Sequence, residues 1–280
     1  MEPCATVNLC FDFDAVSLWM AWGARGVRSL SRGEFGARVG APRILDVLGR
    51  HGIASTWFVP GHTADTFPEI TRRVAESGHE IGNHGYLHEA FDDLALDEIR
   101  AILRKGSDAL ERVTGVRPRG FRAPAGDFSS ELFPLLLEEG FAYDSSRFDG
   151  EYELYWCRGA DSLHDDGPNI MGAPIDLPEV PLSMVMQDFV YFEVNYGSPF
   201  LAGGAPPSRV EEVWRSQFDY MVERVRGGVL TVTMHPQSIG WGGRIVVLER
   251  FIEHVLATPG ARFSTCGVVA EEFRRAEGRA

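Results

Sequence analysis

The chain has 280 residues, of which 44% are hydrophobic, so we expect one domain over residues 1–280 with a barrel-sized core. The formal net charge of −13 excludes a nucleic-acid-binding surface, because such surfaces need clustered Lys and Arg. No apolar stretch approaches the ~20 residues of a membrane helix, and the first residues do not resemble an export signal. We therefore expect a cytoplasmic protein that binds neither nucleic acid nor membrane.

The chain alternates short strands with amphipathic helices almost from end to end, which is typical of a parallel sheet. In the first half, the predicted strands cover residues 6–11, 55–59, 80–82, 120–123 and 141–143. The predicted helices begin at Pro42, span residues 68–78 and 96–114, and lie near residues 130–139. Pro68 and Gly78 frame the second of these helices, since Pro favours the first helical position and Gly the residue after the end.

The second half resumes this alternation after an interruption. Residues 149–207 are rich in Gly, Pro and Asp, and we expect long loops there. A helix over residues 210–226, a strand over 229–234, a helix over 244–257 and a last strand and helix after residue 261 follow. About seven βα units predict an α/β fold, a single distorted (β/α) barrel of about seven strands.

Polar residues follow the predicted strands at their carboxyl ends. These residues are Asp12, Asp14, His84, Arg122, Asp144 and His235. One carboxylate in such a place is commonly a helix cap or turn former. In (β/α) barrels, however, the carboxyl ends of the strands form the rim on which active sites are built. The shared position of these residues therefore predicts one cavity.

His84 and His88 are the sharpest local signal. Two His at positions i and i+4 reach a common point when the segment turns helically, although surface pairs with this spacing also occur. A carboxylate from the first strand completes a set of two His and one Asp, which leaves coordination positions open for water and substrate. We expect a divalent cation here, zinc first, with cobalt, nickel and iron as alternatives.

The motifs resemble, in order and over most of the chain, those of the polysaccharide deacetylases (NodB-homology fold, carbohydrate esterase 4-like). The matching segments are Phe11-Asp12-Phe13-Asp14-Ala15, His84-Gly85-Tyr86-Leu87-His88, Arg122-Ala123-Pro124, Asp144-Ser145-Ser146 with Phe148, and Met234-His235-Pro236. The spaced Asp-x-Asp and the segment over residues 31–35 look like the branch of intracellular peptidoglycan-deacetylase-like proteins and cyclic-imide hydrolases. The resemblance implies metal ligands Asp14, His84 and His88, and a homo-oligomer.

The chemistry of amide hydrolysis suggests roles for three further residues. Asp12 is the candidate base that takes a proton from the attacking water, and Arg122 would hold Asp12 ionised. His235 is the candidate acid, since the leaving nitrogen needs a proton and His titrates near neutral pH. The roles of Asp12 and Asp14, base and ligand, remain interchangeable at this point.

A second group of residues is predicted to contact the substrate. It contains motif residues and pocket-wall candidates near strand ends, namely Trp19, His62, Pro124, Phe128, Asp144 and Phe148. Aromatic residues beside strands are more commonly part of the core, so their place in a pocket is a hypothesis.

We expect a metal-dependent hydrolase of non-peptide carbon–nitrogen bonds that removes the acetyl group from a small-molecule or carbohydrate substrate of the acetamido-sugar type. The alternative is a ring-opening hydrolase of cyclic imides or ureides. Two less favoured alternatives are a catalytically silent carbohydrate-binding barrel and a non-haem iron oxygenase. The oxygenase would carry its ligands on a β-sandwich, which the βα alternation does not support.

Overall fold

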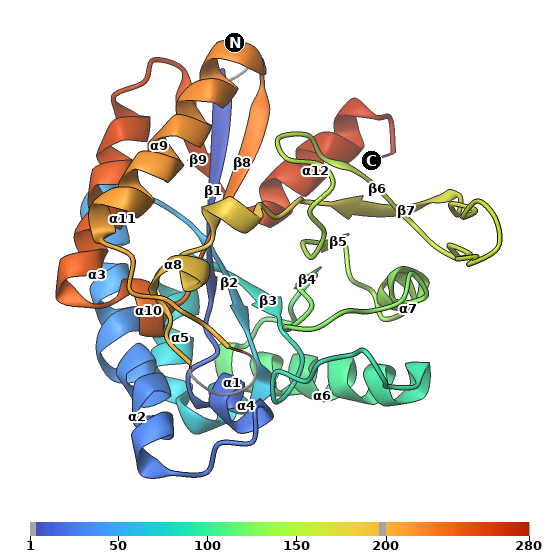
Figure 1. Cartoon of the computed structure of the whole chain (residues 1–280), viewed down its shortest axis with the longest axis horizontal. Helices are drawn as coiled ribbons and strands as arrows, with labels where there is room; N and C mark the ends of the chain where they lie inside the picture. The colour runs from blue at the N-terminus through green and yellow to red at the C-terminus, as the bar shows by residue number, and fades with distance from the viewer. Residues whose placement is uncertain (1–3, 196–199, 280) are drawn as a thin grey trace.

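The computed structural model describes residues 4–195 and 200–279 and contains one curled sheet of nine strands in that part of the chain. The strand order is β6-β7-β5-β4-β3-β2-β1-β8, with β9 beside β1 (Figure 1). The strands are β1 (Ala5–Asp12), β2 (Thr56–Val59), β3 (Glu80–Asn83), β4 (Gly120–Phe121), β5 (Tyr143–Asp144), β6 (Tyr155–Arg158), β7 (Pro174–Glu179), β8 (Gly228–Met234) and β9 (Ala261–Ser264). The predicted α/β barrel-type fold is confirmed, with nine strands rather than about seven in the described residues.

β1 is the centre of the sheet. It pairs in parallel with β2, β8 and β9, and every one of its residues is buried. A parallel strand covered on both faces favours a largely apolar sequence, and the segment Ala5–Asp12 is apolar apart from Thr6, Asn8 and its terminal carboxylate. The charged residue therefore comes at the point where the strand leaves the core.

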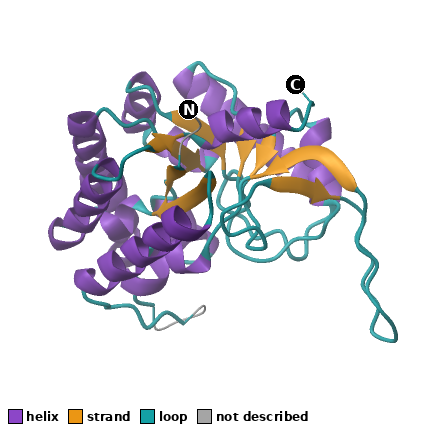
Figure 2. Ribbon diagram, turned by 90° about the horizontal axis from the view of Figure 1, so that it is seen from above, coloured by secondary structure: helices purple, strands orange, loops and turns teal. Residues whose placement is uncertain are grey.

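Helices cover the outer side of the curled sheet (Figure 2). They are α1 (Val16–Ala21), α2 (Val27–Phe35), α3 (Ala41–His51), α4 (Gly61–Thr66), α5 (Pro68–Glu76), α6 (Leu96–Thr114), α7 (Leu132–Glu138), α8 (Phe189–Phe192), α9 (Pro207–Arg224), α10 (Pro236–Ile239), α11 (Gly242–Leu256) and α12 (Cys266–Ala276), with the π-helical turn η1 (Gly36–Gly40) and the 3₁₀ turn η2 (Met184–Met186). None of the helices in the described ranges is long and apolar enough to cross a membrane.

The segment over residues 149–207 differs from the expected long loops. It contains β6 and β7, which pair antiparallel with each other, while β7 pairs in parallel with β5. Pro174 and Pro178 lie within β7, a composition that indicates a loop when it is considered alone. Pairing with distant segments of the chain overrides that local preference, because strand formation depends strongly on its neighbours.

Glycines bring the segment after β1 against the segment after β8. A Cβ atom on Gly33 of α2 would lie 2.4 Å from the carbonyl carbon of Ala15, and one on Gly40 would lie 2.1 Å from the carbonyl oxygen of Pro236. Such distances are far below van der Waals contact, so only glycine permits this approach. The packing places the residues that follow β1 and β8 at one end of the sheet.

We expect Gly40→Ala to lower the free energy of unfolding by about 1–3 kcal/mol, since a methyl group must displace the backbone of Pro236. Gly49→Ala is the matched control. Gly49 lies in α3, and a Cβ atom added to it would have no neighbouring atom within 4 Å, so this change should stabilise the helix by about 0.5–1 kcal/mol. Urea unfolding measures both, and equal effects of the two variants would contradict the close-packing argument.

Candidate active site

A cavity of about 760 Å³ opens at the carboxyl ends of the strands. Of the polar residues that the sequence places at strand ends, all but Asp144 line this cavity. Aromatic and aliphatic side chains form the rest of its lining. Asp12 and Asp14 both point into it, as residues two apart in extended backbone share a face. The convergence predicted from strand ends is thus present for Asp12, Asp14, His84, Arg122 and His235.

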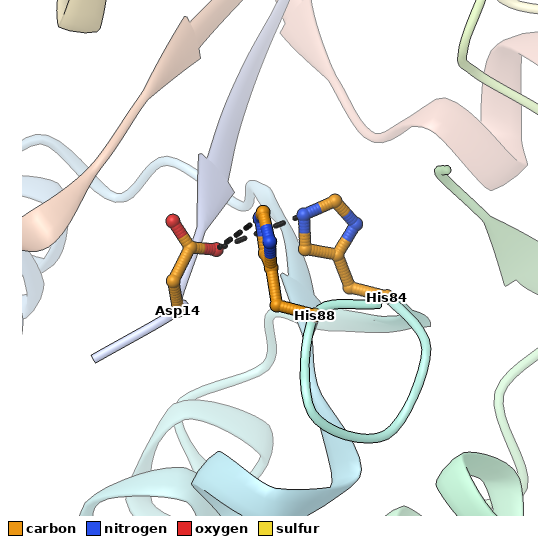
Figure 3. Close-up of side chains that lie close together, drawn as sticks. All are labelled: Asp14, His84 and His88. Atoms are coloured by element: carbon orange, nitrogen blue, oxygen red, sulfur yellow. Dashed lines mark ion pairs between the residues drawn. The ribbon is translucent and has the colours of Figure 1, made fainter. Parts of the chain in front are cut away.

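Asp14, His84 and His88 form a compact cluster (Figure 3). The Nε2 atoms of His84 and His88 lie 3.7 and 3.8 Å from Asp14 Oδ1, and one ligand atom from each residue lies within 4.8 Å of the others. Their spacing suggested a shared helical turn, but the two His do not lie in a helix. They lie in a loop in which Gly85 and His88 have φ of 71° and 63°, and this turn brings both rings to Asp14.

The donor atoms of this cluster suit a divalent cation. His84 donates from Nδ1 to the carbonyl oxygen of Arg122 (2.8 Å), which leaves its Nε2 lone pair facing Asp14. Burial lowers the pKa of His84 to about 4 and that of His88 well below its usual value, so both rings are neutral. Asp14 Oδ2 accepts from Gln237 (3.1 Å), whereas Oδ1 is buried without a hydrogen-bond partner in the described ranges. A cation would satisfy that oxygen.

Arg122 holds Asp12 at the cavity wall. Its Nη1 donates to Asp12 Oδ1 (2.7 Å), its Nε and Nη2 donate to Ser145, and its guanidinium lies 4.1 Å from the ring centroid of Phe58. Burial opposes ionisation of Asp12, but the charge and hydrogen bond of the adjacent guanidinium, together with the neighbouring imidazoles, outweigh it and lower the pKa of Asp12 below its ordinary value. Asp12 is therefore an oriented, ionised carboxylate.

His235 faces the two aspartates and is held from behind by Asp188. Its Nδ1 donates to Asp188 Oδ1 (2.8 Å), and its Nε2 lies 3.8 Å from Asp12 Oδ2 and 4.0 Å from Asp14 Oδ2. Burial favours the neutral ring, but the charge and hydrogen bond of Asp188, together with the charges of the two aspartates, outweigh burial and raise the pKa of His235 to about 9. The imidazolium thus presents an Nε2 proton to the cavity at neutral pH.

The predicted substrate-contacting residues divide into two groups. Pro124, Phe128 and Phe148 line the cavity. Trp19, His62 and Asp144 lie outside its lining: Trp19 is buried under Arg32, His62 Nδ1 bonds the Ser17 hydroxyl, and Asp144 accepts from the Ser146 hydroxyl.

The structure adds cavity residues that the sequence did not single out. They include Phe133 and Phe189. Of the two tryptophans after β1 that sequence reasoning could place at the pocket wall, Trp22 rather than Trp19 reaches the cavity. Asp188 and Gln237 hold His235 and Asp14 through the hydrogen bonds described above. Gln237 could have been noticed two residues after His235, but Asp188 lies in the segment expected to be loop and carries no local signal.

Comparisons with known proteins find similar sequences and similar folds. The profile of the polysaccharide deacetylase family matches residues 33–143. A peptidoglycan deacetylase of Helicobacter pylori is 30% identical over 96% of this chain and 96% of its own. The crystal structure of a polysaccharide deacetylase homologue from Mycobacterium smegmatis is 32% identical with a TM-score of 0.85, covering 99% of this chain and 92% of that one. An allantoinase structure, 21% identical with a TM-score of 0.81 over 100% and 93% of the two chains, shares the fold.

The cluster of Asp14, His84 and His88 is expected to hold one divalent ion. His88→Ala and Asp14→Asn should each abolish stoichiometric metal, because two ligands leave too few donors for tight binding. His62→Ala is the control, since His62 is only half-buried and lies outside the cluster. Elemental analysis after dialysis decides: full retention of metal in both ligand variants would exclude this site.

Proposed function

The chain belongs to the polysaccharide deacetylase family, whose members hydrolyse carbon–nitrogen bonds other than peptide bonds. On that premise we propose that it removes the acetyl group of an N-acetylated amino sugar, with a zinc ion held by Asp14, His84 and His88. The observation that carries the proposal is the arrangement of three differently charged groups around one point. A neutral two-His cluster with an unpartnered carboxylate oxygen lies beside an ionised Asp12 and a protonated His235.

An acetamide resists water because its hydrolysis places negative charge on the carbonyl oxygen and needs a proton on the leaving nitrogen. A bound divalent cation supplies a positive charge for that oxygen and lowers the pKa of water. Asp12 accepts the proton of the attacking water, since its carboxylate is ionised and held in place by Arg122. The low pKa of Asp12 keeps the base available across the neutral range.

His235 supplies the proton that the leaving nitrogen requires. Its Nδ1 is engaged by Asp188, so the proton that can be transferred is the one on Nε2, the atom that faces Asp12 and Asp14. Asp188 also stabilises the imidazolium, so His235 is protonated before the reaction begins. The two titratable groups thus have pKa values displaced in opposite directions, as acid and base on one substrate require.

A substrate screen of the zinc-loaded protein tests the proposal. N-acetylglucosamine oligomers should release acetate, while cyclic imides and allantoin should not be opened. Ring opening without acetate release would overturn the proposal in favour of an amidohydrolase, and Asp12→Asn serves as the blank for both assays.

Asp12→Asn is expected to keep the metal yet lower turnover by ~10²–10⁴-fold, the usual consequence of removing a positioned acid or base. Elemental analysis and acetate release are measured on the same preparation. Loss of metal in this variant would assign Asp12 as a ligand and exchange its role with that of Asp14.

The rate should fall as pH rises through about 9, because His235 then loses the proton that it donates. Asp188→Asn removes the charge that holds this proton, so we expect it to move the alkaline limb to lower pH by roughly one unit or more. His235→Ala should slow substrates with poor nitrogen leaving groups far more than those with good ones. Uniform slowing across leaving groups, with the alkaline limb unmoved, would contradict the role as acid.

A further inference from the structure

Two carboxylic acids lie side by side in the protein interior, behind the cavity wall. Asp144 at the end of β5 and Glu179 at the end of β7 are both 0% exposed, and one ligand atom from each lies within 4.8 Å of the other and of Cys157 Sγ. Two ionised carboxylates this close in the interior would repel each other, whereas a proton on one of them would allow a hydrogen bond between them. The active-site chemistry described above uses neither residue.

The surroundings of the pair do not supply a cation in contact with it. The charged and titratable groups that face it are Cys157 and Tyr155 from β6, Arg147 from the loop after β5, and Arg122 directly after β4. Cys157 donates its thiol proton to Glu179 Oε2 (3.4 Å), while Asp144 Oδ2 is buried without a hydrogen-bond partner among residues 4–195 and 200–279. Two ionised carboxylates in this place would be costly, because burial and mutual repulsion both oppose the second charge.

Each acid holds the loop over residues 145–147. Glu179 Oε1 accepts from the backbone N–H groups of Ser146 (2.8 Å) and Arg147 (3.0 Å), and Asp144 Oδ1 accepts from the Ser146 hydroxyl (2.8 Å). The same loop carries Ser145, whose carbonyl oxygen and hydroxyl each accept from Arg122 at 2.9 Å. A continuous set of hydrogen bonds therefore connects the acid pair to Arg122 and, through it, to Asp12.

We propose that Asp144 and Glu179 share one proton and act as a positioning pair, which fixes the loop over residues 145–147 and thereby the orientation of Arg122 and Asp12. This inference rests on the proposed role of Asp12 as the base. Of the two acids, Glu179 has the clearer shift in pKa: burial and the neighbouring Asp144 raise its pKa well above the ordinary value.

The shared proton has a consequence for stability. A carboxyl whose pKa is higher in the folded than in the unfolded protein contributes stability at acid pH, and this contribution is lost as pH rises through its folded pKa. Glu179 is of this kind, so folding stability should fall as pH rises above the ordinary range of glutamate. Glu179→Gln should remove this dependence, because an amide donates to Asp144 and accepts from the two backbone N–H groups without ionising.

The test compares Glu179→Gln, Glu179→Ala and a control, Asp176→Asn, which removes an exposed carboxylate from the same strand. Glu179→Gln should keep kcat within about 3-fold of the wild-type value. Glu179→Ala should lower kcat by roughly 10²-fold, because the base is displaced. In Glu179→Ala the change in KM should be smaller and the metal should be retained. The decrease in Tm between about pH 5 and about pH 9 should be smaller in Glu179→Gln than in the wild type or Asp176→Asn. Infrared spectroscopy at neutral pH should show a protonated carboxyl band that Glu179→Gln lacks.

Two outcomes would overturn the inference. Absence of that band from the wild type, or an equal dependence of Tm on pH in the wild type and Glu179→Gln, excludes the shared proton. A crystal structure of Glu179→Ala in which Arg122 still bonds both Ser145 and Asp12 excludes the positioning role. Neither result depends on the substrate, so failure of acetate release in the wild type would refute the proposed function separately.

Discussion

The site depends on the hydrogen bonds made by one buried group, the guanidinium of Arg122. It joins Asp12 at the end of β1, Thr233 of β8 and Ser145 after β5, while the carbonyl oxygen of the same residue orients His84. Removing one partner from a buried ion pair costs about 3–5 kcal/mol, because the remaining charge is left in the interior without compensation. The orientation of the proposed base and that of a proposed metal ligand therefore depend on one residue, and the ends of four strands are held in one arrangement.

The interior gives the candidate base and the candidate acid the protonation states that the proposed hydrolysis needs. Asp12 is ionised because Arg122 adjoins it, His235 is protonated because Asp188 adjoins it, and the two His of the metal cluster are neutral because no charged hydrogen-bond partner offsets their burial. Chemically similar side chains thus differ in charge over a few ångströms. The difference comes from which neighbour each one contacts rather than from residue type.

The site also has features that oppose folding. His88 has a positive φ, which is unfavourable for a residue with a side chain, and Asp14 Oδ1 is buried without a partner in the described part of the chain. The glycine contacts between η1 and the segment after His235 hold this arrangement from outside. Local strain of this kind is typical of functional sites, where the surrounding packing has to compensate for it.

The sequence by itself determined the fold class and the residues at the carboxyl ends of the regular strands. Asp12, Asp14 and His235 could be found because each follows an apolar run, and parallel strands in a barrel end at one rim. These signals are local. They need only the strand period and the order of elements, both of which can be read along the chain.

Only the tertiary structure decided which residues support these groups. Asp188 reaches His235 because Gln187 pairs with Thr233 beside β8, and Glu179 reaches the loop after Asp144 because β7 pairs with β5. These contacts join segments more than thirty residues apart. Likewise, the close contact of Gly33 with Ala15 packs α2 against the start of α1, and in that packing Trp22 rather than Trp19 lines the cavity. Partner choice at such positions depends on long-range pairing and packing, which leave no local pattern in the sequence.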